Sequence, residues 1–243
     1  ALLAEPAGGL ELIVSSLGGG RRGEDAPIYA GDGSMAGRSG GAPLYAALDL
    51  GTNNCRLLVA RPVGYCAPTG AEGLRVVDAY SRIVRLGEGL SQTGRLSEAA
   101  IARTIEALQI CRDKMDKRGV TRARLIATEA CRAAANGREF VARVAETTGL
   151  DLEIIDRETE ARLAALGCGS LADPQAEGVL LFDIGGGSTE IVWLAPDRVR
   201  RQGARSVTIW TSIELGVVSL AERFGGHHVD DNGRYDGNGR SLC

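Results

Sequence analysis

Apolar residues along the chain follow strand-like runs first and helical spacing afterwards. The first three runs are strand-like and lie at 45–50, 55–60 and 76–86. Glycines and prolines between the second and third runs mark a hairpin loop. Apolar residues then recur at helical spacing from Ile101 to Met115, and Ser97 and Gly119 are expected to cap the two ends of this helix. The pattern therefore predicts a three-stranded start followed by a long helix.

Strands and helices alternate further along the chain. The pattern predicts strands at 124–127 and 152–155 and helices at 139–148 and 158–166. The order restarts near residue 178 with two successive strands. A third strand at 206–215 and a helix at 217–224 follow them. Three leading strands followed by alternating helices and strands predict a mixed α/β sheet. The restart predicts a second lobe, with a boundary near 171–178.

One apolar run, which is predicted to form a strand, ends in a carboxylate, and the turn that follows it carries small and polar residues. Asp183 lies near the end of this run, and the turn residues are Gly185, Gly186, Gly187, Ser188, Thr189 and Glu190. Glycines leave backbone N–H groups open, and such groups can cradle an anion such as a phosphate. Asp183 could hold a hard cation such as Mg²⁺. The alternative is a plain β-hairpin whose glycines only form the turn.

The same stretch occurs earlier in the chain. Residues 46–59 align with the later stretch without a gap, so that Asp49 corresponds to Asp183 and Arg56 to Glu190. A repeat this far apart predicts a duplicated domain rather than a solenoid. Two glycine-rich hairpins from two similar lobes would then face each other across a ligand cleft.

Composition narrows the classes of function. The chain has 243 residues, is 44% hydrophobic and carries a net charge of −3, so it can form a core and lacks the basic balance typical of nucleic-acid or membrane-surface binding. No apolar run approaches the ~20 residues of a membrane span. Six scattered cysteines without a Cys-x-x-Cys pair predict reduced thiols, a cytoplasmic location and no zinc site. His227 and His228 lack nearby cysteines, which disfavours a metal site there.

Composition also sets the expected domain limits. Residues 1–43 are rich in Gly, Ala, Ser and Arg and are expected to form a disordered N-terminal extension. The folded part is predicted to comprise a first lobe at 44–175 and the start of a second lobe at 176–226. A polar, Gly-rich tail at 227–243 is expected to be disordered.

The second lobe is expected to be incomplete. By analogy with the first lobe, further strands and helices should follow the helix at 217–224, and the tail cannot supply them. An apolar face and a strand edge would then be open to water. Such a lobe is expected to be loose or to take cover from another chain, for instance in a homodimer, and the chain by itself to have little or no activity.

Several motifs in order resemble those of the exopolyphosphatase/guanosine pentaphosphate phosphatase (Ppx/GppA) family, within the acetate kinase–sugar kinase–heat-shock–actin superfold. The matching stretches lie at 48–54, 84–90, 127–132, 160–163, 182–190 and 215–218. The Asp-x-Gly turns alone would fit any kinase or ATPase of the superfold, whereas the run Glu160-Ala161-Arg162 singles out this family. The resemblance implies duplicated ribonuclease H-like (actin-like ATPase) lobes with mixed sheets.

The resemblance implies hydrolysis of a terminal phosphoanhydride bond by an oriented water. Glu160 would be the general base, and the alternative is an ordinary charge at a helix N-terminus. Arg132 would grip phosphate oxygens, and its alternative is a surface salt bridge. Glu190 would order the attacking water or hold Mg²⁺ together with Asp183, and its alternative is an outward-facing strand residue.

The resemblance also implies that both hairpins form phosphate walls. One wall would comprise Asp49, Gly51, Thr52 and Asn53, and the other Gly185, Gly186, Gly187, Ser188 and Thr189. On the third strand, Arg85 is preferred over Arg82 as the residue that faces the phosphates. Arg162 is expected to pair with a carboxylate on its own helix.

The implied substrates are inorganic polyphosphate and guanosine pentaphosphate, and the product is orthophosphate. Polyphosphate is preferred, because a nucleotide needs an aromatic or apolar base pocket and aromatic residues make up only 4% of the chain. Two alternatives of another kind are a phosphate-chain binding module without turnover and a sugar or acetate kinase, which would form ADP from ATP.

Overall fold

The computed structural model describes residues 43–63, 73–168, 171, 176–196 and 205–224. Except for Pro43, the predicted N-terminal extension lies outside the described residues, as do the tail from residue 227, His227, His228 and most of the predicted hairpin loop. Among the described helices, none combines the length and the apolar character that a bilayer crossing requires.

Five strands form the first sheet, in the order β3-β2-β1-β4-β5. They are β1 (Tyr45–Leu50), β2 (Asn54–Val63), β3 (Gly73–Ile83), β4 (Arg122–Ala127) and β5 (Glu153–Ile154). The pairs β1–β2 and β2–β3 are antiparallel, whereas β1–β4 and β4–β5 are parallel. This mixed sheet confirms the predicted α/β class.

The third strand ends three residues earlier than predicted. The apolar pattern continues to residue 86, but β3 stops at Ile83. The backbone N–H groups of Val84 and Arg85 both donate to the Asn53 carbonyl, at 2.9 and 3.0 Å, and Arg85 has a φ of 49°. Val84 and Leu86 are nevertheless fully buried, which explains why the pattern continues beyond the strand.

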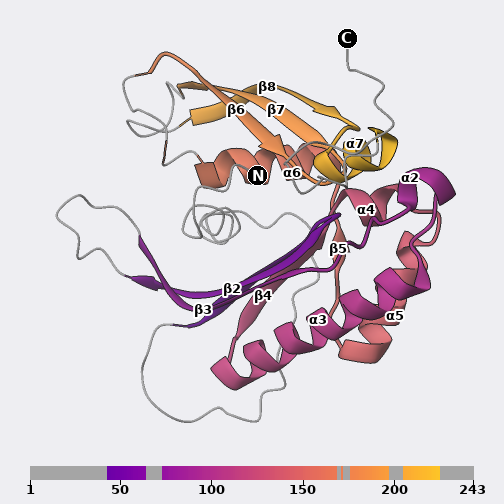
Figure 1. Cartoon of the computed structure of the whole chain (residues 1–243). Coiled ribbons are helices and arrows are strands. Elements are labelled where there is room, and N and C mark those ends of the chain that lie inside the picture. Colours follow the sequence, from indigo (N-terminus) through magenta and orange to yellow (C-terminus); the bar gives the residue numbers. More distant parts are fainter. Residues whose placement is uncertain (1–42, 64–72, 169–170, 172–175, 197–204, 225–243) are drawn as a thin grey trace, which may run out of the picture.

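Helices cover one face of the first sheet (Figure 1). They are α3 (Glu98–Arg118) and α5 (Gly137–Thr148), and the short α4 (Glu129–Ala133) packs on α5. As predicted, the Ser97 hydroxyl accepts the Ala100 N–H at the start of α3, and Gly119 ends the helix with a φ of 65°. Neither α4 nor α2 (Leu90–Thr93) was predicted, because so few residues do not display a helical period.

The main core lies between the first sheet and these helices. Leu48 of β1, Leu125 of β4, Leu108 and Met115 of α3 and Phe140 of α5 are all less than 2% exposed and belong to one cluster. Each buried side chain of this size stabilises the fold by about 1.5–3 kcal/mol. This packed core therefore stabilises the first sheet and fixes the positions at which the loops at its edge begin.

Three antiparallel strands form the second sheet, in the order β6-β7-β8. They are β6 (Val179–Ile184), β7 (Thr189–Pro196) and β8 (Arg205–Ile213). Helix α6 (Arg157–Cys168) covers one face of this sheet, where Ala161 and Ala165 pack on Val192 and Leu194. The same helix packs Leu163 against the first sheet, so it lies between the two sheets (Figure 1).

The other face of the second sheet is apolar and exposed among the described residues. Leu180, Phe182, Ile184, Trp193 and Ile209 are 41% to 67% exposed. The strand register places Trp193 opposite Leu180 on one side and Ile209 on the other, so these side chains form a continuous patch. In its described part, this sheet has no strands equivalent to β4 and β5, which agrees with the prediction of an incomplete second lobe.

Candidate active site

The two glycine-rich hairpins share one backbone geometry, as the internal repeat predicts. The Gly51 N–H donates to the Asn54 carbonyl, and the Gly185 N–H donates to the Ser188 carbonyl, both at 2.9 Å. Each bond closes the turn between two antiparallel strands, β1–β2 in one case and β6–β7 in the other. The sequence repeat is therefore a repeat in structure.

The hairpins differ in charge. The strand register places Asp49 opposite Arg56 in the first hairpin, but Asp183 opposite Glu190 in the second. Burial raises the pKa of Asp49 to about 6; Arg56 opposes this shift and Asp183 adds to it. The influence of Asp183 on Asp49 indicates that the acidic ends of the two hairpins lie near each other.

The two turns lie in direct contact. A Cβ added at Gly187 would lie 2.8 Å from the Thr52 hydroxyl oxygen, and one added at Gly186 would lie 3.0 Å from the Thr52 Cβ. Glycine is thus needed at these positions because the turns approach so closely. The hairpins face each other as predicted, whereas the predicted ligand cleft between them stays a prediction, because the described turns touch at these positions. Thr52 and Ser188 are both buried.

Other groups of the second hairpin are already hydrogen-bonded. Helix α7 (Val217–Phe224) begins against this turn, and the Val217 and Val218 N–H groups donate to the Gly185 and Gly186 carbonyls at 3.0 and 2.8 Å. The Thr189 hydroxyl donates to the Leu215 carbonyl at 2.6 Å. The start of α7 and Thr189 therefore hold the turn in shape.

Glu160 lies in the first turn of α6, and its side chain is 17% exposed. Arg132 Nη2 donates to its Oε2 at 2.9 Å. Burial, followed by the charge of Glu190, raises the pKa of Glu160 to about 7, against the effect of Arg132. The helix cap is provided by Asp156, whose Oδ1 accepts the Thr159 N–H at 2.7 Å, so Glu160 is not the capping residue.

Arg132 is located in α4, just after β4, and its side chain is 18% exposed. Its Nε and Nη2 donate to Glu129 Oε2 at 3.1 and 2.5 Å, and its Nη1 donates to the Ile155 carbonyl at 2.6 Å. With the bond to Glu160, three of its nitrogens are engaged. Arg132 is therefore a largely buried partner of the predicted base rather than a member of a surface salt bridge.

Glu190 is 1% exposed, which excludes an outward-facing strand residue. Burial raises its pKa, against hydrogen bonds from Ser212 and Ser188. The Ser212 hydroxyl donates to Glu190 Oε1 at 2.8 Å. Within the part of the chain that the structure describes, no three Asp, Glu, His or Cys side chains gather closely enough to hold a metal ion by themselves.

The remaining predicted arginines differ in their surroundings. Arg162 pairs with Glu158 one turn earlier on α6 at 2.6 Å, which confirms the predicted partner on its own helix. Arg82 Nη2 lies 3.4 Å from Glu106 on α3. Arg85 is exposed in the turn beyond β3, and its backbone N–H donates to the Asn53 carbonyl of the first hairpin at 3.0 Å.

Sequence reasoning missed the contacts that join the two sheets. Glu222 of α7 accepts the Gly89 N–H at 2.8 Å and the Ser91 hydroxyl at 2.5 Å, which places α7 beside α2 (Figure 1). Arg157 Nη2 donates to Glu214 Oε1 at 2.6 Å. These partners lie far apart in the sequence, so no local pattern indicates them. Glu129 was also missed, although it lies inside the matched stretch 127–132.

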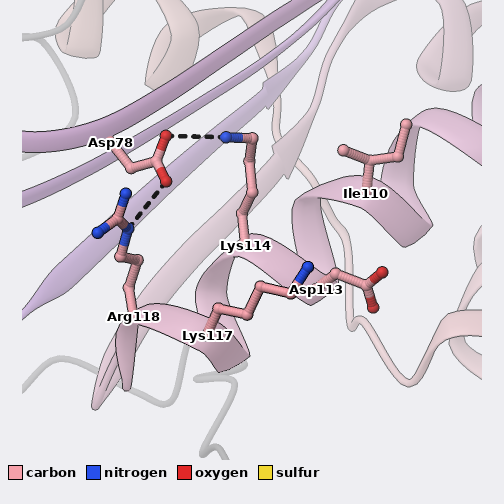
Figure 2. A pocket seen from close by; sticks show the side chains of 6 residues that line it. All are labelled: Asp78, Ile110, Asp113, Lys114, Lys117 and Arg118. Atoms are coloured by element: carbon pink, nitrogen blue, oxygen red, sulfur yellow. Dashed lines mark hydrogen bonds and ion pairs between the residues drawn. The ribbon is translucent and has the colours of Figure 1, made fainter.

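A cavity of about 560 Å³ lies away from these residues, between β3 and α3 (Figure 2). Its lining residues are Asp78, Ile110, Asp113, Lys114, Lys117 and Arg118. Asp78 accepts from Lys114 at 2.8 Å and from Arg118 at 2.9 Å, and these bonds lower its pKa to about 2. No predicted site residue lines the cavity, and two of its cations are already paired.

Known proteins support the resemblance. The sequence model of the Ppx/GppA phosphatase family matches residues 67–231, more than half of the chain. A crystal structure of a Ppx/GppA family member from Aquifex aeolicus is 34% identical with a TM-score of 0.58, and the match covers 75% of this chain and 54% of that protein. An exopolyphosphatase from Cytophaga hutchinsonii is 26% identical with a TM-score of 0.64, and the match covers 76% and 55%.

An exopolyphosphatase-like protein is 29% identical with a TM-score of 0.64, and this match covers 74% of the chain and 53% of that protein. The chain thus spans about half the length of these solved relatives. The family match over residues 67–231 and the similarity to solved family members lead to one conclusion: the chain belongs to the Ppx/GppA phosphatase family.

Proposed function

We propose that this protein hydrolyses the terminal phosphoanhydride bond of inorganic polyphosphate and releases orthophosphate. The observation that carries the proposal is Glu160, a largely buried carboxylate with a pKa of about 7 that Arg132 holds at 2.9 Å. A base with a pKa near the working pH accepts a proton efficiently. The neighbouring glycine-rich turns supply the phosphate-binding backbone that such a base would serve.

In the proposed reaction, water attacks the terminal phosphorus while Glu160 accepts its proton. The new P–O bond forms as the bridging P–O bond breaks, and the shortened polyphosphate leaves with the electron pair. Arg132 keeps the Glu160 carboxylate oriented and supplies positive charge beside it. Backbone N–H groups of the turns around Thr52 and Gly186 bind the phosphate oxygens.

We further propose Mg²⁺ as the cofactor, held by Asp183 and Glu190. The two carboxylates lie opposite each other on β6 and β7, and Mg²⁺ is commonly bound by one or two carboxylates together with waters and substrate phosphates. Burial is the main cause of the raised pKa values of Asp49 and Glu160, and nearby carboxylates add to both shifts; a bound cation would offset this repulsion. When bound, Mg²⁺ would offset the charge of the phosphate chain.

We propose the cytoplasm as the location and no nucleic acid or membrane as a partner. Cys55, Cys111 and Cys131 are buried without a disulfide in the described structure, which fits a reducing compartment. The net charge of −3 also disfavours an extended surface for nucleic acid or anionic lipid.

Guanosine pentaphosphate is the second candidate substrate, because its end carries the same triphosphate-like group as polyphosphate. Orthophosphate release from both substrates, measured side by side with Mg²⁺ and after chelation, tests the proposal. We expect faster release from polyphosphate and a loss of release on chelation. Faster turnover of the nucleotide would overturn the substrate preference, and ADP formation from ATP with an acceptor would indicate a kinase instead.

A further inference from the structure

Glu129 is a buried acidic residue that the proposed reaction does not use. It begins α4 and is 7% exposed. Its Oε2 accepts from Nε and Nη2 of Arg132, and its Oε1 accepts from Nη2 of Arg157 at 3.1 Å. A carboxylate so poorly hydrated is stable only when cations and hydrogen bonds compensate its charge, and here two guanidinium groups do so.

Both arginines that hold Glu129 also reach a second carboxylate. Arg132 donates to Glu160, and Arg157 donates to Glu214 in the segment between β8 and α7. Glu129 is therefore the central member of a chain of charges that runs from the predicted base to the second sheet. Its Cγ would lie 3.1 Å from a Cβ at Gly187, so it also packs under the second hairpin.

The contacts of Arg132 show what Glu129 does for its geometry. A guanidinium is planar, so bonds on two of its sides fix the direction of the third. Glu129 Oε2 accepts from Nε and Nη2, and the Ile155 carbonyl accepts from Nη1. With the guanidinium held on these two sides, Nη2 also donates to Glu160 Oε2. Without Glu129, only one of these two supports would remain and Arg132 could rotate away from Glu160.

We propose that Glu129 is a positioning residue, which holds Arg132 in register with the base Glu160. This proposal rests on the proposed function, in which Glu160 accepts the proton of the attacking water. Glu129 acts through Arg132 and does not touch the substrate. Its removal should therefore lower kcat while KM changes little.

The first test is Glu129→Gln, which keeps the volume and removes the charge. We expect kcat for orthophosphate release from polyphosphate to fall about 10-fold or more, as is common for groups that orient a reacting residue, and KM to change less than about twofold. The matched control is Glu153→Gln, because Glu153 binds Arg124 at 3.1 and 3.2 Å on β4 and β5 outside the site. The control should keep its kcat.

Glu129→Asp is the second variant, in case Glu129→Gln does not fold. It keeps the charge but shortens the reach to Arg132, so it should lower kcat in the same way. A kcat close to wild type for either folded variant would overturn the positioning role. A rise in KM as large as the loss in kcat would overturn it as well, because it would place Glu129 in substrate binding.

A double-mutant cycle shows whether Glu129 acts through Arg132. In an Arg132→Gln background, Glu129→Gln should reduce kcat by less than about twofold further. Losses that multiply would mean that Glu129 acts independently of Arg132, and the proposal would fall.

A third measurement needs no substrate. Melting temperatures of Arg132→Gln, Glu160→Gln and the double variant give the coupling between Arg132 and Glu160, and this coupling should shrink when Glu129 is Gln. An undiminished coupling would contradict the positioning role whatever the activity. A wild-type protein that releases no orthophosphate from polyphosphate, as the incomplete second lobe leads us to expect, would contradict the proposed function for this chain by itself, and the coupling between Arg132 and Glu160 would then decide the positioning role.

Discussion

The pKa of Glu160 depends on three features of its surroundings, namely its burial, the carboxylate of Glu190 and the guanidinium of Arg132. Burial and Glu190 disfavour the charged form, whereas Arg132 favours it, and the resulting pKa is about 7. The sequence could indicate Glu160 through the family motif, but it could not indicate this balance. Glu129 was missed for the same reason, since its partner Arg157 lies 28 residues away.

The pH dependence of hydrolysis follows from this pKa. Only the ionised carboxylate can accept a proton, so kcat/KM should rise with pH through about 7 and level off above it. Arg132 lowers the pKa of Glu160, so Arg132→Gln should move the midpoint upward. A pH–rate profile of both proteins checks this. A midpoint that stays in place or moves down in the variant would contradict the assigned cause.

Folding stability should respond to pH in the opposite sense. The pKa of Glu160 is raised from 4.5 to about 7 on folding, so its stabilising contribution is complete below pH 4.5 and is lost as pH rises to about 7. Between these limits, the melting temperature of the wild type should fall relative to that of Glu160→Gln. If the melting temperatures of the wild type and Glu160→Gln changed by the same amount over this pH window, Glu160 would not be desolvated on folding.

At the scale of elements, the meeting of two hairpins is the feature that builds the site. Periodicity predicted β1, α3 with both caps, and α7, because local side-chain spacing determines these elements. The end of β3 could not be predicted, since it depends on the Asn53 carbonyl in another part of the chain. The short α2 and α4 carry too few residues for a period, although α4 supplies Arg132.

Gly187→Ala should separate the hairpins. Its Cβ would lie 2.8 Å from the Thr52 hydroxyl oxygen and 3.1 Å from Glu129 Cγ, so we expect a loss of about 1–3 kcal/mol in the free energy of unfolding. Thr52→Ala should restore part of that loss. Gly51→Ala is the control for stability, since its nearest neighbour would be 3.6 Å away. Equal melting temperatures for the two glycine variants would contradict the observed contact.

At the scale of the whole molecule, the two sheets differ in how well they are enclosed. Four of the six residues of β1 are buried, whereas none of β6 is. The first lobe of the family fold could therefore be predicted together with its core. The exposed apolar face of the second sheet was predicted from the missing elements, and the described strands show such a face. What covers it depends on contacts that a local pattern does not contain.

This difference predicts unequal hydrogen exchange. Amides of β6 should exchange at least about tenfold faster than those of β1, because exchange follows the local free energy of opening. Exchange measured by mass spectrometry on the monomeric protein provides the comparison. Equal protection of both strands in a monomer would contradict a loosely enclosed second lobe, and protection of β6 that grows with protein concentration would indicate cover by a second copy.

The central claim is that Glu160 is the general base of a phosphoanhydride hydrolase. Orthophosphate release and polyphosphate binding should be measured for wild type, Glu160→Gln and the control Glu158→Gln, whose residue is the exposed partner of Arg162 on the same helix. We predict that Glu160→Gln loses about 10²–10⁴-fold in kcat with binding nearly intact, and that the control stays close to wild type. Turnover by Glu160→Gln at the wild-type rate would contradict the claim.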